Sequence, residues 1–282
     1  MANSSILRYR DAKAIYQLIG ECRELGDDRI RWRDHLIEGL AAMTGADIGH
    51  AGEMAGCRSL TPRDLGVVVW GWQTGFAEMA AIEAGLREFE HDPTMSPAMI
   101  EHLRRHVAED GICLSRSQIL EDRPWYVSAD YQAIQRPFRV DHILWCFRTI
   151  PGAGDDEASG IVLNRQKGRR DFGARDIAIV QETNASLASL LGGPLARFKD
   201  PSPLDLAPRI RQTLACVLEG DSDKQIATRM TLSTHTVNQY TKAIYAHFGV
   251  NGRAELMARW IRRGWGGTLH WSESNARDAQ AR

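Results

Sequence analysis

Near its carboxyl end the chain reads DSDKQIATRMTLSTHTVNQYTKAIYAHFGV, from Asp221 to Val250. Ser222 precedes a short apolar-periodic run and Gln225 follows three positions later, the S-x-x-Q pattern of a helix capping box. Ser233 precedes a second, longer run that ends at Gly249, a residue suited to the left-handed end of a helix. The stretch therefore predicts helices over 223–230 and 234–248, joined by a tight turn as in a helix-turn-helix.

The second of these helices has an apolar side and a polar side. We expect its buried stripe to be Val237, Tyr240, Ile244 and Phe248, at steps of three, four and four residues. The side chains expected to face outward are Thr234, His235, Thr236, Asn238, Gln239, Thr241 and Lys242. Such a helix is roughly 22 Å long and fits a DNA major groove about 12 Å wide. Asn and Gln can hydrogen-bond adenine there, whereas Thr hydroxyls and the helix N-terminus can hold phosphate.

The charge of the chain is divided unequally. The whole sequence of 282 residues has a net charge of −1. Between Leu204 and Trp265 there are nine Lys/Arg and five Asp/Glu, so this segment is near +4 and the remainder is near −5. A small basic domain beside a mildly acidic body suits a polyanionic partner.

From Leu204 to Gly264 the sequence resembles the LuxR/FixJ-type helix-turn-helix family of bacterial transcription regulators. LAPRIRQTLACVLEGDSDKQIATRM resembles the first two helices of that family, and LSTHTVNQYTKAIYAHFGVNGRAEL resembles its recognition helix and the start of its fourth helix. The matching features are the S-x-x-T-V core, the isoleucine seven positions after that valine, the G-V ending and the R-A-E-L start.

The resemblance implies a four-helix unit whose third helix enters the major groove and whose fourth often supports dimerisation. By matching position it places Lys224, Thr236, Val237 and Asn238 at or near DNA. Asn238 stands where the family usually has Lys, and Tyr240 stands where it usually has His. These differences bear on the strength and sequence preference of binding rather than on the fold.

The set of DNA-contacting residues expected from the helix and the resemblance together has eight members. Lys224 and Arg209 are expected at phosphates, and the others at bases or in positioning roles: Thr234, Thr236, Val237, Asn238, Gln239 and Lys242. Two alternatives exist for the same helices. One is the fourth region of sigma factors, which shares the helix pair but usually has a strongly basic helix end; the other is a hairpin that serves only packing or dimerisation.

The preceding part of the chain predicts an α+β domain, an antiparallel sheet with helices. Helical spacing is found over 6–25, 28–44 and 96–108, and in a long run that stops at Gly192; strand-like segments are ADIGHAGEM, LGVVVWGWQT, DHILWCFRTI and ASGIVLNRQ. A linker rich in Pro, Ser and Asp follows. The expected organisation is an N-terminal helix over 1–29, a sensor domain over 30–193, a linker over 194–203, an all-α four-helix domain over 204–265 and a tail over 266–282.

The order and lengths of its expected helices and strands make the front domain similar to the GAF- or PAS-like sensor domains found before this helix-turn-helix. A phosphoreceiver would need an acidic pair after an early apolar strand, but Asp27 and Asp28 lie between two helices. An autoinducer-binding domain is a further alternative whose Trp, Tyr and Asp-Pro spacings RPWYVSADYQAIQRPF does not reproduce. If a ligand binds, aromatic walls with polar tips are its expected site: Trp70, Trp72, Trp125, Tyr126, Tyr131, Phe138, His142 and Trp145.

Signals for catalysis are few. His102 and His106 are four residues apart, but Leu103 stands where a metalloprotease helix has Glu. The glycine-containing segments GADIGHAG and PGAGDDEASG do not contain the dinucleotide-binding motif G-x-G-x-x-G, and neither is followed by the phosphate-binding G-K-[ST]. A Cys–His nucleophile from Cys113 or Cys146 with His142 remains an alternative to buried cysteine packing. We therefore expect no enzyme, no cofactor, no metal site and no catalytic residue.

The five cysteines are odd in number and scattered, which favours a reducing cytosol over a disulfide framework. The first residues have no basic stretch followed by an apolar region, so we expect no signal peptide, and the longest apolar-rich run, LGVVVWGW, is too short to span a bilayer. We expect a cytoplasmic transcription regulator that binds double-stranded DNA as a homodimer, with an unknown small-molecule ligand, a contact with RNA polymerase and no membrane partner. The alternative is a small-molecule-binding or enzymatic front domain for which the C-terminal helices act only in dimerisation.

Overall fold

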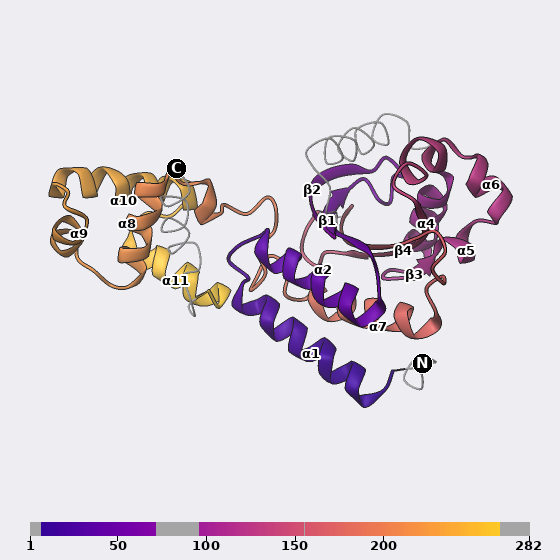
Figure 1. The fold of residues 1–282 in the computed structure, drawn as a ribbon. Coiled ribbons are helices and arrows are strands. Elements are labelled where there is room, and N and C mark those ends of the chain that lie inside the picture. The colour runs from indigo at the N-terminus through magenta and orange to yellow at the C-terminus, as the bar shows by residue number, and fades with distance from the viewer. Residues whose placement is uncertain (1–6, 72–95, 155, 266–282) are drawn as a thin grey trace. The chain divides into compact units, whose positions relative to one another are not determined.

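The computed structural model describes residues 7–71, 96–154 and 156–265, which form two compact units (Figure 1). The front unit comprises the chain up to Cys22 together with Arg33–Leu191. The C-terminal unit comprises Arg23–Trp32 together with the chain from Gly192 onward.

The front unit contains a five-stranded antiparallel sheet with the strand order β2-β1-β5-β4-β3. The strands are β1 (Ile48–Ala55), β2 (Arg63–Trp70), β3 (Cys113–Ser115), β4 (Val140–Thr149) and β5 (Glu157–Gln166). Four of them lie in the segments whose composition predicts strands. The three-residue β3 is too short to leave a periodic signal and was not predicted.

Helices cover both faces of this sheet (Figure 1). α2 (Arg31–Thr44) and α7 (Ala174–Ala188) lie on one face, where a Cβ on Gly49 would meet Ile37 and where Asn184 donates to the carbonyl of Cys146 at 3.1 Å. α1 (Tyr9–Glu24) packs on α2, because Gly39 leaves room for Leu18. The opposite face carries α4 (Pro97–Ala108), α5 (Arg116–Ile119), α6 (Asp122–Val127) and the π-helical turn η2 (Tyr131–Gln135).

The C-terminal unit is helical. It contains α8 (Pro208–Leu218), α9 (Asp223–Met230), α10 (Thr234–Phe248) and α11 (Arg253–Arg263), preceded by the 3-10 turn η3 (Pro203–Asp205). The predicted fold class is thus confirmed: an antiparallel α+β domain comes first and an all-α helix-turn-helix domain follows it. Among the described residues, none of the helices combines the length and the apolar character needed to cross a bilayer.

The segment expected to be a linker, 194–203, packs inside the C-terminal unit. Leu195, Ala196 and Ser202 are buried. The backbone carbonyl of Ala196 accepts from the indole N–H of Trp32 at 3.0 Å, and that of Pro194 accepts from the indole N–H of Trp265 at 2.8 Å. These contacts give the segment a fixed conformation that its Pro and Ser content alone does not indicate.

Candidate nucleic-acid interface and the aromatic face

The two helices of the opening stretch begin at side-chain caps. The Ser222 hydroxyl accepts from the amide of Gln225 at 3.4 Å, and Gln225 Oε1 accepts from the Ser222 amide at 2.8 Å, so the predicted capping box is present. The Ser233 hydroxyl accepts from the amide of Thr236 at 3.0 Å. Each cap satisfies an amide that the first helical turn leaves unpaired, and this fixes where α9 and α10 begin.

The same helices end at left-handed residues. Gly249 has φ 59°, and the amide of Val250 donates back to the carbonyl of Tyr245 at 2.9 Å, a Schellman ending. At the end of α9 the left-handed residue is Thr231, φ 55°, whose β-branched side chain makes that conformation strained. This ending turns the chain so sharply that α10 begins only four positions after Met230, the last residue of α9.

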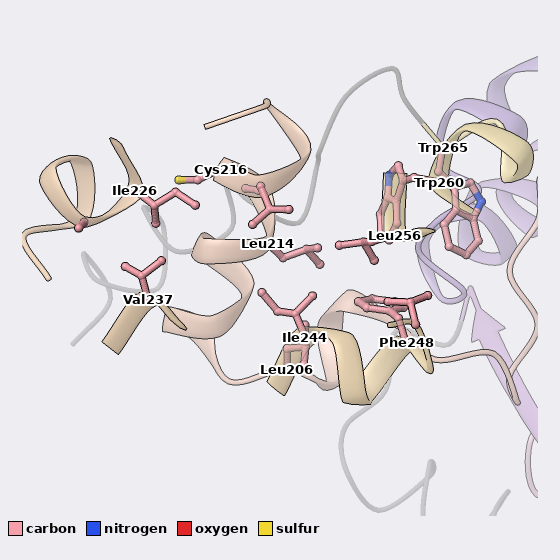
Figure 2. Packing of buried hydrophobic residues seen from close by; sticks show 14 of the residues in the cluster. Leu206, Leu214, Cys216, Ile226, Val237, Ile244, Phe248, Leu256, Trp260 and Trp265 are labelled. Atoms are coloured by element: carbon pink, nitrogen blue, oxygen red, sulfur yellow. The ribbon is translucent and has the colours of Figure 1, made fainter. Parts of the chain in front are cut away.

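One face of α10 is locked into a hydrophobic core shared with the other C-terminal helices (Figure 2). Its buried residues are Val237, Thr241, Ile244 and Phe248, at steps of four, three and four. The predicted stripe was therefore wrong at one position: Thr241 is buried, not outward, and Tyr240 is only half-buried. Thr241 tolerates burial because its hydroxyl donates to the carbonyl of Asn238 at 3.0 Å.

The opposite face of α10 remains accessible. Thr234, Asn238, Gln239 and Lys242 are exposed. Thr236 is half-buried, and its hydroxyl lies 2.8 Å from that of Ser233, so it supports the helix cap. Val237, which the resemblance placed at or near DNA, has an exposed fraction of 0% and packs in the core instead.

The cations of 204–265 fall into two groups. Three hold neighbouring carboxylates of this unit: Arg229 pairs with Glu219 and Asp221, Arg253 with Asp223, and Arg263 with Asp200. The hydrogen bonds that Arg229 donates to Glu219 and Asp221 raise its pKa. Among the described residues no ion pair is found for the other six, which are Arg209, Arg211, Lys224, Lys242, Arg259 and Arg262. The two predicted phosphate contacts, Arg209 and Lys224, are exposed members of this second group.

In the front unit, four of the predicted ligand residues gather where α6, η2 and β4 meet on the side of the sheet that carries α4 and α5. We call them the aromatic face: Trp125, Tyr126, Tyr131 and Trp145. The ring centroid of Tyr131 lies 5.4 Å from that of Trp125 and 4.9 Å from that of Tyr126. Phe138 packs against the same cluster.

Two other predicted ligand residues lie on the opposite face of the sheet. Trp70 pairs with Gly49, and a Cβ on Gly49 would point toward Ile37 of α2. Because cross-strand partners share a face, Trp70 lies on the face that α2 covers. His142 is three positions from Trp145 on β4, so the two side chains point to opposite faces; its Nε2 lies 2.9 Å from the carbonyl of Arg169. Trp72 lies outside the described residues.

The aromatic face contains a polar atom buried without a partner. The indole Nε1 of Trp125 makes no hydrogen bond among the residues that the structure describes, and the exposed fraction of Trp125 is 0%. His102 on α4, next to this face, also has an exposed fraction of 0%. The His102 ring packs edge-on against Phe147 with centroids 5.1 Å apart. Burial and the nearby His106 lower the pKa of His102 to about 4, so its imidazole is neutral at pH 7.

Tyr126 is the polar edge of this face. Its hydroxyl donates to Asp141 at 2.9 Å, and burial together with that hydrogen bond raises its pKa to about 12. The phenol therefore stays protonated, and its hydroxyl proton is already donated to Asp141. Trp125 Nε1, by contrast, is a buried donor without a partner among the described residues.

Two capped helices joined by a tight turn, with amide side chains on the exposed side of the second, define a helix-turn-helix DNA-binding unit. Residues 204–259 match the family model "Bacterial regulatory proteins, luxR family". The C-terminal unit therefore carries a LuxR-type helix-turn-helix domain.

Two curated relatives match part of the chain. The chain is 34% identical over 110 residues to "Response regulator Rre1" of Synechocystis sp., covering 36% of this chain and 47% of that protein. It is 35% identical over 80 residues to "Probable HTH-type transcriptional regulator GfsR" of Streptomyces halstedii, covering 28% and 33% respectively. The chain thus spans less than half the length of the curated relatives it matches.

Two solved structures match the chain at low identity. SdiA of Escherichia coli matches with 14% identity and a TM-score of 0.37, covering 88% of this chain and 98% of that one. The "VqsR LBD domain" of Pseudomonas aeruginosa matches with 14% identity and a TM-score of 0.44, covering 62% and 92%.

Proposed function

We propose that the protein is a DNA-binding transcription regulator whose helix α10 docks in the major groove. The observation that carries this proposal is that one face of α10 is buried in the core and the opposite face is exposed. Val237 and Ile244 are fully buried, whereas Asn238, Gln239 and Lys242 are exposed on the other side. A rigid scaffold that presents amides and a cation is what direct base readout requires.

Contacts with DNA divide by position and charge. Asn238, Gln239 and Lys242 read or approach base edges from α10, and Thr234 with the start of α10 holds a phosphate. Lys224 at the start of α9 and Arg209 on α8 also bind phosphate, because both are exposed and neither is in an ion pair among the described residues.

The active form is a symmetric homodimer on two half-sites. The reason is electrostatic, since α10 carries Lys242 as its only Lys or Arg. One unit therefore neutralises few phosphates and binds weakly, and two units on adjacent half-sites add their contacts. A contact of the bound dimer with RNA polymerase would convert binding into altered transcription.

The front unit is proposed to be a GAF- or PAS-like sensor for a small molecule. Supporting this are the aromatic face and the unpaired indole N–H of Trp125, because a buried donor without a partner is costly unless something accepts its hydrogen bond. The ligand would be a largely apolar molecule with an acceptor atom placed for Trp125. The rival function is a binding or enzymatic front unit for which the C-terminal helices only dimerise.

Gel shifts with the full chain and genomic DNA fragments separate the proposed function from its rival. We expect binding by the wild-type chain and loss of binding in Lys224→Ala and Asn238→Ala, while Gln17→Ala, which removes an exposed amide from α1, binds normally. The absence of binding to every fragment would support the rival.

Native mass spectrometry of protein taken directly from cells tests the sensor proposal. We expect an added mass on the wild-type chain that decreases in Trp125→Phe, because this substitution keeps the ring shape but removes the N–H donor. An unmodified mass for both proteins would contradict a ligand bound at the aromatic face.

A further inference from the structure

Two side chains on the exposed face of α10 contact each other. Gln239 Nε2 lies 3.1 Å from His235 Nε2, and the two residues are four positions apart, one turn along the helix. Both are exposed, and the core contacts of Val237 together with the Ser233 cap hold the helix that carries them. The contact belongs to the face that we propose reads DNA.

The chemistry of this contact fixes which atoms of Gln239 remain available. With the amide oriented as in the structure, Gln239 Nε2 donates and His235 Nε2 accepts, which is the tautomer that carries the ring proton on Nδ1. Gln239 then has one N–H and its carbonyl oxygen left. Adenine presents the complementary pair in the major groove, an N7 acceptor beside an N6–H donor.

Resting on the proposed function, we propose that His235 is a positioning residue that makes Gln239 read adenine. With a hydrogen-bond donor at position 235, the amide would turn over and accept through its oxygen. Its two N–H groups would then face the groove, where they match the N7 and O6 acceptors of guanine rather than adenine. The residue at position 235 therefore selects the base without touching it.

Sequence reasoning placed His235 on the outward side of the helix but gave it no role. The signal that could have assigned one is its spacing, since residues at i and i+4 of a helix are neighbours. Asn238 and Lys242, each three positions from one member of the pair, are two further exposed polar residues of this face. Neither has a hydrogen bond to His235 or Gln239 among the described side chains.

The test is selection from a pool of duplexes with a randomised core, using the full chain and sequencing the bound DNA. Comparison of Gln239→Ala with the wild-type chain identifies the base position that Gln239 reads, because the variant loses its base preference at that position. Loss of a bidentate contact should reduce preference there by about 5- to 150-fold. His235→Ala should reduce the adenine preference at that position alone by about 1.4- to 2.3-fold, the scale of a contact between residues four apart on a helix.

Matched variants at position 235 separate positioning from a structural role. His235→Glu keeps an acceptor and should retain adenine, whereas His235→Arg supplies a permanent donor and should shift preference toward guanine. In a Gln239→Ala background, both substitutions should leave base preference unchanged. Preference is compared within each pool, so a change in overall affinity from the altered charge does not affect the result.

The failures of the two proposals are distinguishable. If the wild-type chain enriches no sequence, the proposed DNA-reading function fails and this inference fails with it. If the wild-type chain and Gln239→Ala behave as expected but His235→Glu and His235→Arg select the same base, the positioning role of His235 is refuted while DNA binding stands.

Discussion

Helix α10 and strand β4 differ in how much of their surface is exposed. One face of α10 is buried and the other is free, so its amides can exchange water for DNA without leaving an unpaired group behind. Both faces of β4 are covered, and the side chains packed against its Trp145 and Phe147 include the fully buried imidazole of His102. The first arrangement suits reversible binding of a surface, and the second suits a buried ligand or a response to pH.

The largest expected effect is on the locked face of α10. Phe248 is 2% exposed and packs edge-on against Trp260 with ring centroids 5.5 Å apart. Phe248→Ala should lower the free energy of unfolding by about 3–5 kcal/mol, through lost burial and the cavity left behind. Urea denaturation measures this, with Lys242→Ala, an exposed change on the same helix, expected to stay within about 0.5 kcal/mol. Equal effects of the two changes would show that α10 is not anchored by this core.

The pH dependence of stability tests the buried polar groups beside β4. The pKa of His102 is about 4 in the folded chain, below about 6.5 in an unfolded one. The unfolded state therefore binds the proton first, so stability is complete above about pH 6.5 and falls as the pH drops toward 4, by up to about 3 kcal/mol.

Denaturation midpoints of the wild-type chain and of His102→Gln, measured at steps from pH 7 to pH 4.5, isolate this contribution, because carboxylates titrate alike in both proteins. His102→Gln should have the shallower dependence. Parallel curves would mean that His102 is not held neutral by burial.

A smaller effect is expected at the cap of α10. Ser233→Ala should cost about 1 kcal/mol, because the amide of Thr236 loses its acceptor. Thr234→Ala removes an exposed hydroxyl one position later and should have less effect. An unchanged midpoint for Ser233→Ala would contradict the observed start of the helix.

The smallest expected effect is on the salt dependence of DNA affinity, which should differ between Lys224 and the ion-paired Arg229. We expect a shallow fall of DNA affinity with salt, because few phosphates are neutralised; a log–log slope as steep as about −10 would contradict this. Lys224→Gln should reduce the slope by about 1, whereas Arg229→Gln should leave it nearly unchanged, because Arg229 already holds Glu219 and Asp221. Anisotropy titrations at several salt concentrations measure both.

The same comparison explains what could be predicted from the sequence. The bounds of α9 and α10 follow from local signals, because Ser222, Ser233 and Gly249 act within a few residues of their own position. The choice between Tyr240 and Thr241 for the buried stripe could not be predicted in this way. Steps of three and four both fit a helix, and the hydrogen bond of Thr241 to Asn238 makes its burial acceptable.

The front unit depends on non-local pairing, which the sequence does not reveal. Because helices cover both faces of the sheet, β4 is apolar on both sides, and alternation cannot show which residues share a face. Trp70 and His142 were therefore grouped with Trp125 and Trp145, although the register of the strands places them on the other face.

The central claim is that α10 enters the major groove, and methylation interference tests it most directly. Dimethyl sulfate modifies guanine at N7 in the major groove and adenine at N3 in the minor groove, and the full chain is then allowed to select from the modified duplexes. The account predicts that methylated guanine N7 in the half-sites is depleted from the bound fraction while methylated adenine N3 is not. Depletion of adenine N3 with no effect at guanine N7 would contradict it.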